Sequence, residues 1–291
     1  MTRGKPTYQS PWLYLVPTIA ILAVSAVYPL IQAFALSLYD LRWGETASFV
    51  WFKNFGNLLS DHRVWKVFGR TALFSVSSVA IELALGLLFA LAVDRLAWGQ
   101  GIVRTMIILP LMISGIATSL IWKVLLDPAS GLVNYVLSLG GVTNAPAWFG
   151  SPSMALPSLV LVDTWWQTGF AFIVLAAAIK GLPADTFEAA KIDGASSFQA
   201  FRYITLPLLL PVIGTIAIFR LIDTLKVFDI VFGTTGGGPA QSTEMIQTFA
   251  YRTAFKFLEL GRSSAIMVIF STIFILICAL LIFRAEKTTT R

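Results

Sequence analysis

Six long apolar blocks, separated by polar sequence rich in Lys, Arg, Gly and Pro, make up most of the chain. A helix needs about 20 apolar residues to cross a bilayer, and each block reaches that length. The pattern therefore predicts six membrane-spanning helices, near residues 12–38, 68–93, 104–125, 155–178, 207–229 and 263–284. We expect residues 1–291 to form a single all-α membrane domain, in which the mostly polar residues 183–207 connect the fourth span to the fifth.

The Lys and Arg residues of the loops favour an orientation with both termini in the cytoplasm. In that orientation the basic residues on the cytoplasmic side are Arg3, Lys5, Arg95, Arg104, Lys180, Lys191, Arg202, Arg284, Lys287 and Arg291. The outer segment 126–154 contains no Lys or Arg. Four basic residues of the first outer loop count against this orientation: Arg42, Lys53, Arg63 and Lys66. The balance still places residues 183–207 in the cytoplasm.

The composition supports a membrane protein and excludes most enzyme classes. Hydrophobic residues make up 57% of the chain and charged residues 12%, whereas about a quarter of the residues in a soluble domain are charged. The net charge of +6 comes from scattered Lys and Arg, without the basic run expected for nucleic-acid binding. One cysteine, Cys278, and one histidine, His62, are too few for a zinc site or most nucleophilic triads, and no phosphate-binding glycine loop is present. We therefore expect no catalytic residue, no metal and no cofactor on this chain.

Local sequence signals divide residues 183–207 into two short helices with a sharp turn between them. Asp185 places negative charge in the first turn of the first helix, where the helix dipole favours it. Gly194 is suited to a left-handed helix stop, and Ser196 with Gln199 three residues later forms a capping-box pattern. These signals alone do not distinguish a docking segment from an ordinary solvated loop.

The same stretch carries a long signature: Glu188-Ala189-Ala190, three residues, Gly194, nine residues, then Ile204-x-Leu206-Pro207. It resembles the EAA signature of the permease subunits of bacterial ABC importers, with every spacing in place. The six-span plan, the "TGGGPAQST" stretch after the fifth span and the following "YRTAF" are similar to carbohydrate-uptake permeases, of the larger-subunit type in maltose and glycerol-phosphate transporters. The chain lacks the extra N-terminal spans and the large outer loop of the maltose subunit.

The resemblance implies the type I importer permease fold and a bacterial cytoplasmic (inner) membrane location. Residues 183–207 are then the coupling loop that docks on a cytoplasmic ATPase, with its contacts at Glu188, Ala189, Ala190, Asp193 and Gly194. It further implies a heterodimer with a second EAA-type permease, two copies of the ABC ATPase, which bind ATP and Mg²⁺, and an extracytoplasmic solute-binding protein.

Polar and aromatic residues within the spans are candidates for the cargo path, because a bare charge in a bilayer is costly. Trp side chains beside amide and carboxylate groups suit a sugar, although an interfacial aromatic belt has the same composition. In the similar permeases, cargo contacts come from the spans that flank the coupling loop. The candidates here are Asp163, Trp165, Trp166, Gln167, Phe170, Arg220, Asp223 and Thr224. Glu82 is interpreted as an internal ion-pair partner that secures helix packing, and Asp223 is spaced to pair with Lys226.

Two other functions are weighed against an importer permease for a sugar, oligosaccharide, polyol or sugar-phosphate-like solute. A stand-alone secondary transporter or channel would show inverted repeats and helices broken at the midplane, and no repeat between the halves is evident. An intramembrane enzyme would need a convergent set of nucleophile, base or metal ligands, which the scattered carboxylates do not offer.

Overall fold

The structure is a computed structural model, in which residues 12–142, 144 and 146–289 are described. Arg3, Lys5 and Arg291, which contribute to the predicted orientation, lie outside the described residues. The chain divides into two compact units: the first combines Met1–Asp61 with Ala250–Thr272, and the second combines His62–Phe249 with Ile273–Arg291. Each unit is described by itself.

The first unit is built around the end of a long apolar helix. Its elements are α1 (Trp12–Ser37), β1 (Tyr39–Asp40), β2 (Ser48–Phe49), α2 (Lys53–Ser60), the end of α12 (Ile246–Phe255) and the start of α13 (Leu260–Thr289). β1 and β2 pair in an antiparallel hairpin, with Tyr39 opposite Phe49. Asn54 Nδ2 donates to the carbonyls of Ser37 and Tyr39 at 2.8 and 2.9 Å, which fastens α2 to the end of α1.

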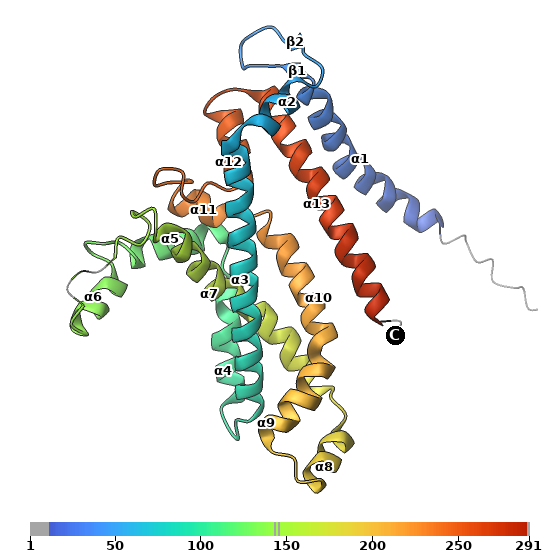
Figure 1. Ribbon diagram of the computed structural model, residues 1–291, viewed down its shortest axis with the longest axis vertical. Helices are drawn as coiled ribbons and strands as arrows, with labels where there is room; N and C mark the ends of the chain where they lie inside the picture. Colours follow the sequence, from blue (N-terminus) through green and yellow to red (C-terminus); the bar gives the residue numbers. More distant parts are fainter. Residues whose placement is uncertain (1–11, 143, 145, 290–291) are drawn as a thin grey trace, which may run out of the picture. The chain divides into compact units, whose positions relative to one another are not determined.

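The second unit holds most of the chain, and three of its helices lie side by side at its centre. Its elements are α3 (His62–Asp94), α4 (Gln100–Ile108), η1 (Leu109–Met112), α5 (Gly115–Leu125), α6 (Leu132–Leu139), α7 (Ala155–Lys180), α8 (Ala184–Ile192), α9 (Ser197–Ala200), η2 (Phe201–Thr205), α10 (Leu206–Thr224) and α11 (Asp229–Thr234), followed by the start of α12 and the end of α13. The central three are α3, α7 and α10, of which α3 and α7 pack along the greatest length (Figure 1).

Two apolar clusters form the core of these three helices. One contains Phe74 of α3 and Leu159 of α7, and the other contains Ala90 of α3 with Phe172 of α7 and Ile216 of α10. Close approach in the second cluster depends on Gly86, because a Cβ there would lie 2.7 Å from the Cβ of Ala171. Small residues at helix crossings are the usual route to tight packing in membranes, where lipid provides no hydrophobic drive between helices.

The described helices account for the predicted spans, with one break that the sequence pattern did not predict. Five helices are long and apolar enough to cross a membrane, and a bent pair, Gln100–Met112 with Gly115–Leu125, makes a sixth if counted as one span. The pair is bent by 103°, so the predicted span 104–125 is not one straight helix. Pro110 lies in the short 3₁₀ turn η1, and Ser114 begins α5 as its N-cap, with its side chain accepting from the Ala117 N–H at 3.4 Å. The fifth span ends at Thr224 instead of residue 229.

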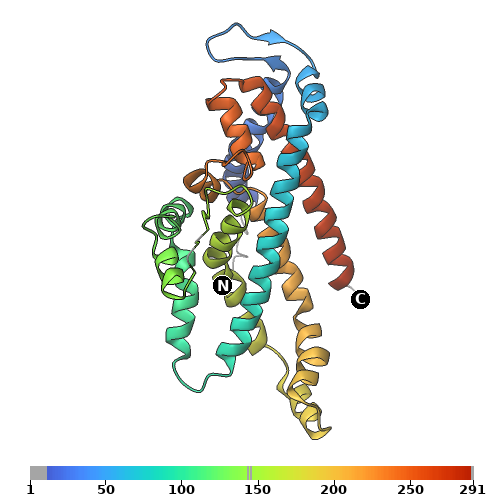
Figure 2. The ribbon, with the colours of Figure 1, turned by 60° about the vertical axis from the view of Figure 1, so that its left-hand side comes forward.

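Figure 2 shows that the turn between α3 and α4 lies at the same end of the second unit as α8 and α9. That turn contains Arg95, and α8 contains Lys191, so two of the basic segments assigned to one side of the membrane do lie at one end of this unit.

Candidate functional site

A buried ion cluster joins the three central helices of the second unit. Arg220 of α10 donates from Nε to Glu82 Oε2 at 2.7 Å and from Nη2 to Glu82 Oε1 at 2.9 Å. The same Nη2 reaches Asp163 Oδ2 of α7 at 3.3 Å. Nη1 donates to Asp223 Oδ2 at 2.5 Å, one helical turn further along α10. The Arg220 guanidinium thus donates hydrogen bonds to three carboxylates, which come from α3, α7 and α10.

The cluster lies in an environment where unpaired charge is costly. The side chains of Arg220, Glu82 and Asp163 are 4, 0 and 5% exposed, whereas that of Asp223 is 62% exposed. Along α3, Glu82 stands two turns from Phe74 on one side and two turns from Ala90 on the other, between the two apolar clusters. A bidentate guanidinium–carboxylate pair is the geometry that best offsets desolvation at such a position. Glu82 therefore forms the interhelical ion pair expected of it, with a partner 138 residues away.

A small polar cavity of about 170 Å³ adjoins the exposed side of this cluster. Its lining residues come from the first half of α7, the end of α10, the segment that follows it and the start of α11: Asp163, Trp166, Asp223, Thr224, Lys226, Val227, Phe228, Asp229 and Ile230. Four of the predicted path residues, Asp163, Trp166, Asp223 and Thr224, are thereby brought together. The expected pair between Asp223 and Lys226 is replaced by the pair between Asp223 and Arg220.

Trp166 also supports the break between η1 and α5. Its Nε1 donates to the carbonyl of Ile113 at 2.9 Å, which satisfies a backbone acceptor exposed by the break. Gly115 allows this approach, since a Cβ there would lie 2.9 Å from the Trp166 ring and 2.8 Å from Asp229 Oδ2. Trp166 and Asp229 are therefore held where the bent pair meets the cavity.

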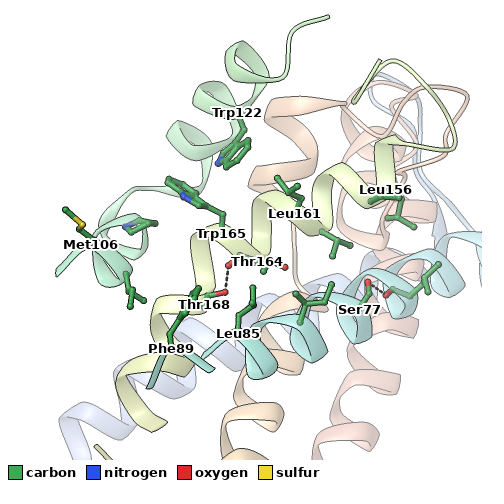
Figure 3. Close-up of a pocket in the computed structure, with 16 residues that line it drawn as sticks. Ser77, Leu85, Phe89, Met106, Trp122, Leu156, Leu161, Thr164, Trp165 and Thr168 are labelled. Carbon is green, nitrogen blue, oxygen red and sulfur yellow. Dashed lines mark hydrogen bonds between the residues drawn. The ribbon is translucent and has the colours of Figure 1, made fainter. Parts of the chain in front are cut away.

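Trp165 points into a different and larger hollow, a groove of about 930 Å³ (Figure 3). The α3 side of this groove is a stripe at four-residue spacing: Leu73, Ser77, Ile81, Leu85 and Phe89. Figure 3 shows Trp165 beside Trp122 of α5, and their rings meet edge to face at 5.4 Å and 74°. Thr164 and Thr168 line the same groove, and the Thr168 hydroxyl donates to the Thr164 carbonyl at 2.6 Å. The groove is otherwise apolar, so it differs in chemistry from the cavity at Asp163.

The structure thus separates residues that are adjacent in the sequence. Trp165 faces the apolar groove and Trp166 the polar cavity, because successive residues of a helix point about 100° apart. Gln167 is 8% exposed, and Phe170 packs against the apolar cluster that contains Phe172. The residues that sequence reasoning missed are Asp229 and Gly115. Only the three-dimensional meeting of α5 and α11 reveals them.

The predicted coupling segment has the local geometry that its sequence indicates. Gly194 has a φ of +78°, and the chain closes α8 there with backbone bonds from Gly194 N to Lys191 O (3.2 Å) and from Ala195 N to Ala190 O (2.9 Å). Ser196 and Gln199 form a reciprocal capping box at the start of α9. Both the left-handed glycine and the capping box are confirmed.

The surface of this segment is open. Glu188, Ala189, Asp193 and Gly194 are exposed, and Ala190 is partly buried. Three large apolar or aromatic side chains that were not predicted as contacts are also exposed: Ile192 (86%), Phe198 (73%) and Tyr203 (72%).

Over residues 12–142, 144 and 146–289, no group of three or more His, Cys, Asp or Glu side chains is arranged to hold a metal ion. Within the same residues, Cys278 is a free, partly buried thiol, and His62 is exposed at the start of α3.

Comparison with known proteins identifies the family of this chain and several similar permeases. Residues 82–286 match the family described as "Binding-protein-dependent transport system inner membrane component". The chain is 35% identical over 259 residues to the trehalose/maltose transport system permease protein MalF of Thermococcus litoralis, covering 89% of this chain and 87% of that protein. It is 33% identical over 276 residues to the sn-glycerol-3-phosphate transport system permease protein UgpA of Agrobacterium fabrum, covering 92% of each.

The fold is similar to a chain in the crystal structure of a bacterial ABC transporter that imports the acidic polysaccharide alginate. The TM-score is 0.82 at 22% identity, with 95% of this chain and 94% of that chain covered. A second structure, of the bacterial alginate transporter with an alginate pentasaccharide-bound periplasmic protein, gives a TM-score of 0.83 over 96 and 94%. This chain belongs to the family of binding-protein-dependent transport system inner membrane components, and is a multi-pass membrane permease subunit of the ABC importer type, not an enzyme.

Proposed function

We propose that this permease subunit carries a sugar, an oligosaccharide, a polyol or a sugar-phosphate-like solute, driven by ATP hydrolysis on separate cytoplasmic subunits. One observation carries the proposal: α9, η2 and α10 form a single apolar helix of 28 residues, from Ser197 to Thr224. Its first turn belongs to the coupling segment, and its last turns hold Arg220, Asp223 and Thr224 beside the polar cavity. At 1.5 Å per residue its ends are about 40 Å apart, so one element links the docking surface to the cavity.

The docking partner we propose is a cytoplasmic ABC ATPase, present in two copies and binding ATP and Mg²⁺. Exposed apolar side chains in an otherwise polar segment, Ile192 and Phe198 above all, suit an apolar cleft on such a partner. Ala189 and Ala190 allow close backbone approach, and Glu188 is free to reach a basic group. Asp193 and Gly194 shape the turn that presents both short helices.

The remaining partners are a second EAA-type permease, with which this chain forms a heterodimer, and an extracytoplasmic solute-binding protein. One of the two similar structures contains an ABC transporter in complex with a periplasmic protein, which supports the second of these partners. We place the chain in a bacterial cytoplasmic (inner) membrane with both termini in the cytoplasm. The basic segments that cluster at the α8–α9 end of the second unit support this orientation.

For the cargo path we propose first the residues that line the polar cavity, Asp163, Trp166, Asp223 and Thr224. A sugar ring stacks on an aromatic face while its hydroxyls bind carboxylates and a threonine hydroxyl. Trp165 meets cargo only if the path includes the apolar groove. Gln167, Phe170 and Arg220 line neither the polar cavity nor the apolar groove, and we propose that they hold the lining residues in position.

The alternative of a stand-alone secondary transporter or channel is not favoured, because the chain belongs to a family of binding-protein-dependent permeases.

Reconstitution tests the proposal. The chain is co-purified with the proposed second permease and ATPase, placed in liposomes and supplied with the binding protein and candidate sugars. We expect ATP-dependent uptake that requires every subunit, and in Thr224→Ala cargo handling weaker by about 1–3 kcal/mol with unchanged assembly. Uptake by this chain alone, driven by an ion gradient without ATP, would refute the proposal.

A further inference from the structure

Arg220 has the chemistry of an anion-binding residue, yet four of its five N–H groups already donate to carboxylates. A guanidinium presents a planar fork that suits carboxylate and phosphate groups. Here Nε, Nη2 and Nη1 donate to carboxylates of this chain, and Arg220 itself does not line the polar cavity. Asp223 does line it, with a side chain that is 62% exposed. Asp223 therefore lies between the guanidinium and the space available to cargo.

The balance of charge at the cavity is negative. Three carboxylates, Glu82, Asp163 and Asp223, surround one guanidinium, so the acidic groups of the cluster outnumber its single cation. The other charged lining residues, Asp229 and Lys226, cancel one another. Asp163 and Asp223 line the cavity and Arg220 does not, so it is the acidic side of the cluster that faces the cavity.

We infer that this cavity accepts a neutral or cationic polyhydroxylated cargo and rejects anions such as sugar phosphates and uronates, with Asp223 as the residue that determines the selectivity. An anion entering the cavity meets net negative charge and gains a cationic partner only by displacing Asp223 from Arg220. A hydroxyl or an ammonium group instead donates directly to Asp223, beside the Trp166 ring. The inference rests on the proposed function, because it names the class of cargo for the same cavity.

The family does not decide this point. One relative is named for trehalose and maltose, another for glycerol 3-phosphate, and the similar structure for an acidic polysaccharide. The charge of the cargo therefore has to be determined from the residues of this chain.

The first test measures the charge of the cavity without any cargo. A cysteine replaces Val227, which lines the cavity, in a Cys278→Ala background within the assembled complex. Its reaction rates with a cationic and an anionic methanethiosulfonate are compared with those of Ser153→Cys, an exposed position in an outer segment. We expect the ratio of cationic to anionic rate to be about tenfold higher at position 227 than at position 153, and to fall at least about threefold when Asp223→Asn is added. An equal or lower ratio at position 227 overturns the inference.

The second test measures whether Asp223 covers Arg220. Protection of the cysteine at position 227 from a neutral methanethiosulfonate is recorded in millimolar glucose 6-phosphate. We expect no protection with Asp223 present, and at least about threefold slower labelling in Asp223→Asn, where the guanidinium is uncovered. Asp229→Asn is the matched control, since it removes the same charge from the cavity lining without exposing Arg220. Equal protection in the two variants, or none in Asp223→Asn, overturns the assignment of Asp223.

These outcomes are separable from those of the proposed function, because the labelling requires no transport. A complex that imports glucose 6-phosphate as fast as a neutral sugar refutes the inference and leaves the proposed function standing. A complex that imports nothing with ATP refutes the proposed function, whatever the labelling ratio.

Discussion

Replacing Arg220 by methionine removes the cation shared by the three carboxylates of the ion cluster, while keeping a side chain of comparable length. Glu82 and Asp163, with 0 and 5% of their side chains exposed, are left in the core without their partner. Breaking a buried pair in this way typically costs about 3–5 kcal/mol, because the remaining charge stays desolvated. We expect the free energy of unfolding of the second unit to fall by that amount, and the midpoint of thermal denaturation by on the order of 10 °C.

The assay is the fraction of this chain that remains soluble and assembled after heating the purified complex. Arg262→Met is the matched control, since Arg262 forms a partly exposed pair with Asp61 at 3.2 Å and its loss is expected to cost about 1 kcal/mol or less. Adding Glu82→Gln and Asp163→Asn to Arg220→Met should recover most of the midpoint, because no buried charge is then left. A midpoint for Arg220→Met equal to that of wild type refutes the reasoning, and a triple variant as unstable as the single one shows that the loss is one of packing.

Three further predictions concern the coupling segment and the topology. Gly194→Leu forces a bulky side chain into a φ of +78°, at a cost of roughly 1 kcal/mol or more, and should reduce co-purification with the ATPase. Gly194→Asn is the control and should be milder. Wild-type uptake in Gly194→Leu would show that the turn is not critical. Glu188→Lys and Ala190→Trp should each uncouple ATP hydrolysis from transport, although the chain still inserts into the membrane. Glu188→Gln is the conservative control. Full coupling in both variants would show that the segment is an ordinary loop. In a Cys278→Ala background, Gln199→Cys should resist membrane-impermeant reagents applied outside and Ser153→Cys should react, and the reverse pattern would invert the orientation.

The spans and the coupling turns could be predicted because their causes are local. A block of some twenty apolar residues is sufficient to define a membrane helix, and the left-handed Gly194 and the Ser196 capping box depend on residues within one or two turns.

The tertiary features could not be derived in the same way. The partner of Glu82 lies 138 residues away, and several basic residues were equally available to it from sequence. Because the α4–α5 pair is apolar on both sides of Ser114, hydropathy reads it as one continuous span and gives no sign of a 103° bend. From sequence, Trp165 and Trp166 form one aromatic site. In the structure they point from adjacent positions of α7 toward different neighbours, so Trp165 lines the groove and Trp166 the polar cavity.

The contacts around Glu82 restrict which parts of this permease can move. One turn along α3 from that carboxylate, Gly86 packs against Ala171 with no room for a Cβ, so α3 is fixed to α7 at almost the same height at which Arg220 fixes it to α10. Sliding α3 by a single 5.4 Å turn would break its bidentate ion pair with α10 and its close contact with α7, and sliding α10 or α7 would break one of these two. The three are therefore expected to rotate as one block during a transport cycle. The bending then falls to the irregular segments at its borders: residues 95–99, the break at Ser114, Gly181–Pro183 and the stretch between Thr224 and Asp229.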